Sequence, residues 1–100
     1  MLDPLQPFRL DGKVAIVTGA SAGLGERFAR VLHAVGATVV VTARRAERLE
    51  ALVADLPGAI SIVADVAAPA DRERLIGETL ERAGRIDVLV NNAGIAEVVG

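Results

Sequence analysis

The stretch Thr18–Gly25, TGASAGLG, decides the fold because it places glycines at positions 19, 23 and 25 directly after the apolar run VAIV at residues 14–17. Glycine adopts positive φ without strain and allows a ligand to approach the backbone closely. The residues that follow repeat apolar side chains at helical spacing, so the turn joins a strand to the start of a helix. Because the free N–H groups at a helix start attract anions, the turn predicts a pocket that suits a pyrophosphate.

A tight strand-to-helix turn whose glycines only permit close packing would have the same composition, and a glycine triplet by itself does not exclude that alternative. The position of this triplet between a strand and a helix favours binding. A P-loop is excluded, because Gly25 is followed by Glu26 where a P-loop has lysine.

The rest of the chain alternates short β-branched runs with longer stretches of helical period, the pattern of βαβ units and a parallel sheet. Right-handed crossovers place the expected strands in the order 3-2-1-4. We therefore predict an α/β fold of the Rossmann type, a doubly wound parallel sheet between two layers of helices (three-layer α/β/α). The fourth strand has no outer neighbour from this chain, so more chain, a partner or a covering segment is expected at its edge. The predicted strands are residues 14–18, 38–42, 60–64 and 86–90, and the predicted helices run from the glycine turn to Gly36, over 46–56 and over 70–83.

The first predicted helix is amphipathic, with one apolar face expected toward the core. The residues of that face are Leu24, Phe28, Val31, Leu32 and Val35, and Glu26, Arg27, Arg30 and His33 fall mostly on the other face. The charged residues 71–74 are expected to form a solvated helix start, and Asp87 is expected to begin a strand.

Length and charge limit the class of protein. One hundred residues allow one small domain, which we place at residues 13–100 after a short extended leader at residues 1–12. The leader lacks the apolar run of a secretory signal or a membrane anchor. A net charge of −2 argues against nucleic-acid and membrane partners, and the absence of cysteine with a single histidine argues against a metal site. These features fit a cytoplasmic protein.

The end of the second predicted strand indicates which dinucleotide is bound. An NAD-binding unit usually has Asp or Glu there, about 20 residues after the turn, to bind the ribose hydroxyls. This chain has TARR at residues 42–45 instead. Without a carboxylate to repel a 2′-phosphate, the guanidiniums of Arg44 and Arg45 favour NADP over NAD, with Arg44 as the expected contact. The alternative is a solvated helix start in which Arg45 or Arg48 pairs with a nearby glutamate.

Three polar residues follow later strands at the same edge of the sheet, where ligands bind in open α/β folds. Asp65, after the third strand, lies close to where an adenine ring is expected and could accept a hydrogen bond from its amino group. Spacing alone favours a local turn made by this carboxylate instead. Asn91 and Asn92, after the fourth strand, could bind a ribose or tie neighbouring strands together, and the sequence leaves both roles open.

These segments together resemble the short-chain dehydrogenase/reductase family. The matching pieces stand in the family's order and spacing from Phe8 to about Ile95, and they are LDGKVAIVTG, TGASAGLG, GATVVVTARR, Asp65–Val66 and RIDVLVNNAG. The resemblance implies a cofactor turn in which the following residues contact or support the pyrophosphate, the ribose and the dinucleotide: Gly19, Ala20, Ser21, Ala22, Gly23, Leu24 and Gly25. It also implies that Arg44 with Arg45 contacts the 2′-phosphate and that Asp65 with Val66 contacts adenine. The nicotinamide-side ribose would be contacted by Asn92 with Ala93 and Gly94.

The family's chemistry, by this resemblance, is hydride transfer between NAD(P) and a small alcohol or carbonyl substrate. Its catalytic tyrosine, and the lysine four residues later, have no counterpart here, because the sequence contains no tyrosine and Lys13 is its only lysine. The chain therefore resembles the cofactor-binding front part of a longer NADP(H)-dependent oxidoreductase, for which the family likeness implies a homotetramer or dimer. The alternative is a non-catalytic dinucleotide-binding module or half-domain. A Tyr-x-x-x-Lys segment downstream of Gly100 would distinguish the two.

Overall fold

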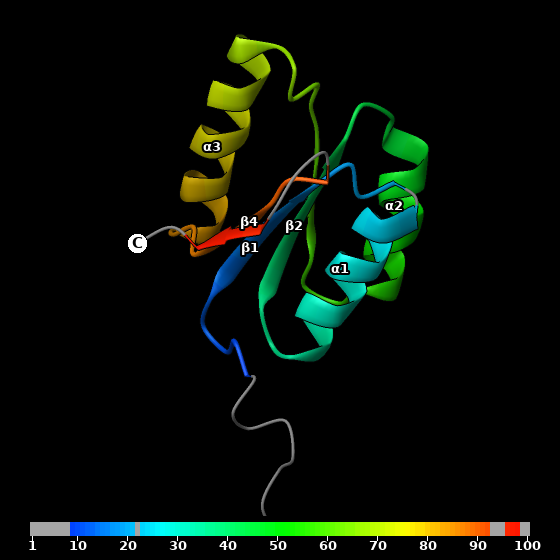
Figure 1. Cartoon of the computed structure of the whole chain (residues 1–100), viewed down its shortest axis with the longest axis vertical. Helices are drawn as coiled ribbons and strands as arrows, with labels where there is room; N and C mark the ends of the chain where they lie inside the picture. The colour runs from blue at the N-terminus through cyan, green and yellow to red at the C-terminus, as the bar shows by residue number, and fades with distance from the viewer. Residues whose placement is uncertain (1–8, 22, 93–95, 99–100) are drawn as a thin grey trace, which may run out of the picture.

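The computed structural model describes residues 9–21, 23–92 and 96–98, with side chains described as far as Asn92. Strands and helices alternate along the chain up to the fourth strand (Figure 1). In chain order the elements are β1 (Val14–Thr18), α1 (Gly23–Ala34), β2 (Thr38–Ala43), α2 (Ala46–Asp55), β3 (Ile60–Val63), α3 (Pro69–Ala83), β4 (Val88–Val90) and β5 (Ala96–Val98).

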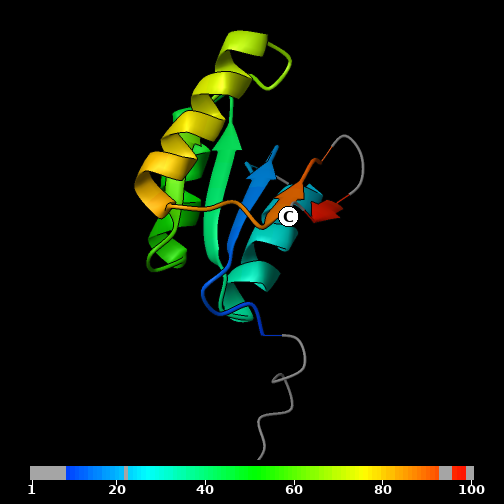
Figure 2. The same cartoon turned by 90° about the vertical axis from the view of Figure 1, so that its left-hand side faces the viewer.

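The strands form one sheet in the order β3-β2-β1-β4-β5, in which β1 to β4 are parallel. Helices α1 and α2 cover one face of this sheet and α3 covers the other (Figures 1 and 2). These observations confirm the predicted Rossmann-type sheet, its strand order 3-2-1-4 and its three layers. The boundaries differ slightly, since β2 continues to Ala43, β3 ends at Val63 and β4 begins at Val88.

β1 is buried on both faces because helices lie on each side of the sheet. Ala15 and Val17 pack in the cluster beneath α1 and α2, whereas Val14 and Ile16 pack in the cluster beneath α3. Both edges of β1 are also paired, one with β2 and the other with β4. The glycine turn therefore starts from a strand that is held on every side.

β5 covers the edge that was expected to lack a neighbour from this chain. Its residues pair antiparallel with β4 in the register Val88↔Val98, Leu89↔Glu97 and Val90↔Ala96. The expectation that β4 has no outer neighbour from this chain is therefore wrong, because β5 of the same chain covers its edge. The physical reason is that an open strand edge carries unpaired N–H and C=O groups, which a returning segment satisfies.

α1 lies on the sheet through its smallest residues rather than through its large apolar ones. Gly25 and Ala29 are buried, whereas Leu24, Phe28 and Val31 are 57%, 37% and 60% exposed. The expectation that these three side chains face the core is wrong. A Cβ at position 25 would collide with the backbone of the glycine turn, so only glycine lets the helix start come this close. This close approach decides which face of α1 meets the sheet.

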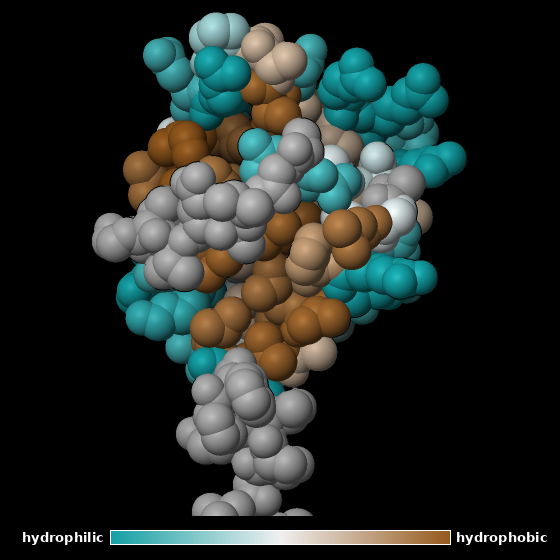
Figure 3. Space-filling view, viewed as in Figure 1, coloured by the Kyte–Doolittle hydropathy of each residue, from teal (hydrophilic) through white to brown (hydrophobic). Residues whose placement is uncertain are grey.

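Large apolar side chains are also exposed on α3, where Ile76 and Leu80 face outward. Figure 3 shows hydrophobic residues gathered between α3 and α1, with hydrophilic residues toward the margins. Exposed apolar surface of this kind is typical of a region that another element or partner covers. Among the described residues, no helix has the length and apolar composition needed to cross a membrane.

The described part of the predicted leader packs on the domain. The Leu10 N–H donates to the Val35 carbonyl at 2.7 Å, and the Leu10 side chain packs against the core. Arg9 pairs with Asp11 at 2.8 Å and donates to the Ala34 carbonyl at 3.4 Å. These contacts attach the chain to the end of α1, and residues 1–8 of the predicted leader lie outside the described residues.

Asp87, the residue before β4, joins two strands. Its carboxylate accepts the Val14 N–H at 2.8 Å and pairs with Arg85 at 2.7 Å. The Arg85 guanidinium first, and the Val14 amide second, lower the pKa of the Asp87 carboxyl below its ordinary value. Asp87 therefore does more than begin a strand, because it links β4 to the central strand β1.

We expect Asp87→Asn to lower the melting temperature at neutral pH, because the variant keeps an acceptor for Val14 but loses its charge. A carboxyl whose folded pKa is lowered stabilises the fold above its unfolded pKa, about 3.9 for aspartate, and this contribution is lost as pH falls through the folded value. The difference in unfolding free energy between wild type and variant should therefore shrink below about pH 4. Urea unfolding across this pH range measures it, with Glu81→Gln on α3 as the control. A difference that stays constant into strong acid would contradict the expectation.

Candidate functional site

The glycine turn after β1 provides the framework of the site. Gly19 and Gly23 both have a φ of +59°, a conformation that other residues rarely adopt. The Ala20 N–H donates to the Thr42 carbonyl at 3.1 Å, which ties the turn to the end of β2. A Cβ added to Gly23 would meet no described atom within 4 Å. The turn is therefore held by its neighbours and leaves its outer side open to a ligand.

A hollow of about 210 Å³ opens beside this turn, at the carboxyl ends of β1, β2 and β3, and we call it the turn hollow. Its lining residues are Gly19, Ser21, Thr42, Ala43, Arg44, Ala64, Asp65 and Val66. The fold thus brings together three predicted segments, which are the glycine turn, the end of the second strand and the residues after the third strand. This edge is where ligands bind in open α/β sheets.

A second hollow, the arginine hollow, adjoins the first and shares Ser21 and Arg44 with it. It measures about 260 Å³ and is lined by Ser21, Arg44, Arg45 and Arg48. None of the three guanidiniums forms an ion pair or hydrogen bond with another described residue. The predicted alternative, in which Arg45 or Arg48 pairs with a nearby glutamate, is therefore not observed. Three guanidiniums without a counter-charge around one small hollow favour an anionic ligand.

Arg48 lines the arginine hollow in addition to the two arginines that the sequence predicts for the site. Arg45 is the residue before α2, and Arg48 follows it by three positions in the first turn of the helix. The N-cap residue and the third residue of a helix lie next to each other, as in a capping box. This spacing is the signal that could have revealed a third arginine beside the two predicted ones.

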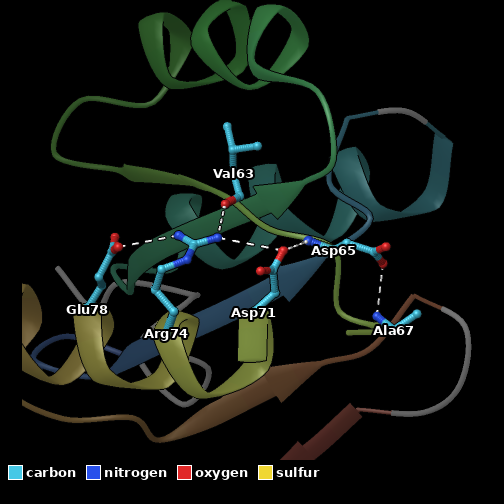
Figure 4. Close-up of polar contacts among 6 residues, drawn as sticks. All are labelled: Val63, Asp65, Ala67, Asp71, Arg74 and Glu78. Carbon is cyan, nitrogen blue, oxygen red and sulfur yellow. Dashed lines mark hydrogen bonds and ion pairs between the residues drawn. The ribbon is translucent and has the colours of Figure 1, made fainter. Parts of the chain in front are cut away.

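Asp65 and Val66 begin the connection from β3 to α3, and both line the turn hollow. Asp65 accepts the Ala67 N–H through Oδ1 at 3.0 Å, so its carboxylate makes a local turn (Figure 4). The other oxygen, Oδ2, accepts no hydrogen bond from the part of the chain that is described. The local turn is observed, therefore, and it leaves one oxygen of Asp65 available to a ligand.

Residues 71–74 form the solvated helix start that the sequence predicts, since Arg72, Glu73 and Arg74 are exposed in the first turns of α3, but some of their side chains also bond to the backbone of the preceding connection. Asp71 accepts the Asp65 N–H through Oδ2 at 2.7 Å, and Arg74 donates to the Val63 carbonyl at 2.7 Å (Figure 4). These additional bonds, which the sequence does not predict, form because the connection from β3 runs alongside the first turns of α3. Its backbone groups thereby come within reach of side chains that local sequence places in water.

Asn91 and Asn92 tie β4 to β1. The Thr18 hydroxyl donates to Asn91 Oδ1 at 3.4 Å and accepts the Asn92 N–H at 3.1 Å. The Asn92 side-chain amide donates to the Gly19 carbonyl at 3.4 Å, so it also supports the glycine turn. Of the two roles left open by the sequence, the tie between strands is observed, and contact with a ribose stays a prediction.

Other predicted site residues differ in what the structure says of them. Ala22, Ala93 and Gly94 lie outside the described residues. Gly25 is buried against the backbone of the turn, so it acts through close packing rather than by direct contact with a ligand. Leu24 is exposed on α1, and its contact with a dinucleotide stays a prediction.

The two hollows together offer groups that suit a ligand with phosphates and an amine. Backbone N–H groups of the glycine turn suit phosphate oxygens, because they lie at the start of α1. The arginine hollow offers charge-assisted donors for a further phosphate. Asp65 offers an acceptor for an exocyclic amine. This arrangement can bind and orient such a ligand.

Comparison with known proteins covers nearly the whole chain. The sequence model of the short chain dehydrogenase family matches residues 13–100, which include every residue that lines the two hollows. The chain is 42% identical over 95 residues to 11-beta-hydroxysteroid dehydrogenase 1A of Arabidopsis thaliana, covering 89% of this chain and 27% of that protein. It is 40% identical over 91 residues to a sorbitol dehydrogenase of Cereibacter sphaeroides, covering 90% of this chain and 36% of that protein.

Solved structures show the same relationship. The crystal structure of a hydroxysteroid dehydrogenase from Escherichia coli matches with a TM-score of 0.84 and 32% sequence identity, over 90% of this chain and 39% of that chain. The chain therefore spans roughly a third of the length of the proteins it matches.

Proposed function

Because this chain belongs to the short chain dehydrogenase family, we propose that the protein is an NADP(H)-dependent oxidoreductase that transfers hydride between its cofactor and an alcohol or carbonyl substrate. In this proposal residues 13–100 supply the cofactor-binding part. The observation that carries the choice of cofactor is the arginine hollow beside the glycine turn. The names of two relatives, a hydroxysteroid dehydrogenase and a sorbitol dehydrogenase, support the substrate class.

The proposed cofactor extends from the arginine hollow across the glycine turn. Backbone N–H groups of Gly19 and Ser21 would hold the pyrophosphate near the start of α1, beside Ala20, whose own N–H is bonded to a β2 carbonyl. Asp65 Oδ2 accepts the adenine amino group, and Asn92 contacts the nicotinamide-side ribose. When the cofactor is bound, its nicotinamide ring supplies or accepts the hydride. The side chains described here bind and orient it.

Electrostatics support NADP rather than NAD. A phosphate monoester carries about −1.5 to −2 charges at neutral pH, because its second pKa is about 6. The guanidiniums of Arg44, Arg45 and Arg48 surround the hollow where such a group would lie, and no carboxylate lines it. A ribose with free hydroxyls would leave these three like charges without compensation.

The acid and base groups of the reaction are proposed to lie outside these residues, since the sequence has no tyrosine and its single lysine, Lys13, precedes β1. The exposed apolar side chains of α1 and α3 support the presence of further chain packed against them. The alternative remains a non-catalytic dinucleotide-binding module, and the sequence downstream of Gly100 decides between the two. Cytoplasmic location and assembly into a homotetramer or dimer stay predictions.

Fluorescence titration with NADPH and NADH tests the cofactor assignment. We expect NADPH to bind at least about tenfold more tightly, since hydrogen bonds to a charged phosphate contribute about 1.5–3 kcal/mol. Added salt should reduce this preference, because salt screens exposed guanidiniums. Equal affinities would refute the NADP assignment and leave the dinucleotide site intact. If the complete protein bound neither cofactor, both the enzyme and the binding-module hypotheses would fail.

A further inference from the structure

Three charged side chains at the start of α3 reach back to the backbone of the connection that precedes this helix. The bonds are Asp65 N–H to Asp71 Oδ2 at 2.7 Å, Arg72 Nη1 to the Val66 carbonyl at 2.9 Å, and Arg74 Nη2 to the Val63 carbonyl at 2.7 Å. We call Asp71, Arg72 and Arg74 the α3 clamp. Its members lie within about one turn of helix and hold the connection at three points.

The clamp contains ion pairs, but its hydrogen bonds to the backbone contribute more to holding the connection in place. Arg74 lies 3.7 Å from Asp71 and 3.3 Å from Glu78 (Figure 4). Exposed ion pairs of this kind contribute little to stability by themselves. Charge-assisted hydrogen bonds to backbone groups are stronger, and here they reach closely spaced residues of a single connection. The clamp therefore restrains the position of that connection.

The clamped connection forms one wall of the turn hollow, through Ala64, Asp65 and Val66. From the other side, the Ala64 N–H donates to the Ala43 carbonyl of β2 at 3.0 Å. The connection is thus held between β2 and α3. Asp65 lies in the middle of this restrained segment, with Oδ2 available beside the hollow.

We propose that the α3 clamp positions Asp65 and Val66 for adenine recognition. This inference rests on the proposed function, because it takes the turn hollow to be the adenosine site. Hydrogen bonds weaken steeply when distance and angle depart from their optimum. A connection free to move would therefore bind purines without distinguishing their 6-substituents. Adenine has an amino donor at that position, whereas hypoxanthine has an oxo group that the Asp65 carboxylate repels.

The test compares 2′,5′-ADP with inosine 2′,5′-bisphosphate, which differ in the base and share both phosphates, by calorimetric titration of the purified protein. Wild type should prefer adenine by about tenfold. Asp71→Ala should reduce this preference to about twofold, because the Asp65 N–H loses its partner. Asp71→Asn keeps an acceptor and should retain most of the preference. Glu78→Gln is the matched control, since Glu78 pairs with the same Arg74 but forms no bond with the connection.

The inference is overturned if Asp71→Ala prefers 2′,5′-ADP over inosine 2′,5′-bisphosphate by the same factor as wild type. An equal loss of affinity for both ligands also overturns it, because that result indicates a merely structural role. If Asp71→Ala does not fold by circular dichroism, Arg72→Ala replaces it under the same criteria. Wild type and Asp65→Asn are measured before any clamp variant. If wild type binds the two ligands equally and Asp65→Asn leaves both affinities unchanged, the proposed adenine contact fails independently of the clamp.

Discussion

Arg44→Asp is expected to reverse the cofactor preference of the protein. Arg44 lines both hollows, so its replacement removes a charged donor and places a carboxylate beside the 2′-phosphate. Loss of the charged hydrogen bonds, about 1.5–3 kcal/mol, weakens NADPH binding by about tenfold to a hundredfold before repulsion is counted. NADH should bind more tightly, because a carboxylate at this place accepts hydrogen bonds from ribose hydroxyls. Fluorescence titration of both cofactors measures the two changes.

Arg82→Asp is the control for net charge, because Arg82 lies in the last turn of α3 and lines neither hollow. It should leave both affinities unchanged. Arg48→Gln should weaken NADPH binding less than Arg44→Asp, since two guanidiniums remain and no negative charge is added. If NADPH keeps its advantage in Arg44→Asp, the assignment of Arg44 to the 2′-phosphate is wrong.

Gly25→Ala should both destabilise the fold and abolish tight cofactor binding. The added Cβ would overlap the Gly19 carbonyl oxygen and lie 2.8 Å from the Gly19 carbonyl carbon, and neither backbone atom can rotate away. Overpacking of this kind costs about 1–3 kcal/mol. Relief requires that α1 move away from the turn, which displaces the N–H groups expected to hold the pyrophosphate. We expect NADPH affinity to fall by more than about tenfold, measured together with urea unfolding.

Gly77→Ala is the matched control in α3, where an added Cβ meets no described atom within 4 Å. Removing a glycine from a helix interior should stabilise the fold by about 0.5–1 kcal/mol. The two substitutions are chemically identical, so opposite signs isolate the effect of close packing at Gly25. An equal effect at both positions would contradict the role given to Gly25.

The fold was predictable up to β4 because each of its first four strands and three helices has a local signature. The apolar run before Gly19 and the helical spacing after Gly25 specify a strand, a turn and a helix in adjacent residues. Repetition of that unit, with right-handed crossovers, leads to the observed strand order. β5 had no such signature, because it forms only where the edge of β4 offers unpaired backbone groups.

The orientation of α1 could not be predicted from its apolar pattern. Periodicity identifies a hydrophobic face, but it does not say which neighbour covers that face. Gly25 and Ala29 meet the sheet because small residues allow the backbones to approach, and Phe28 and Val31 remain on the outside. The hydrogen bonds of Asp71 and its neighbours could not be predicted either. Their partners are backbone groups of the connection from β3, and the local sequence does not show that this connection lies beside α3.

By itself, the sequence determined the α/β class and the glycine turn, because each depends on residues close together in the chain. The sequence also determined the strand order, because the repeated strand-helix unit has right-handed crossovers. It also indicated Arg44, Asp65 and Asn92 through their positions after successive strands. Only the tertiary structure decided that Ser21 lies beside the three arginines of the arginine hollow, that the α3 clamp holds Asp65, and that Asn92 supports Gly19. These contacts join segments from different strands and helices, and the distances between such segments depend on how the whole sheet packs.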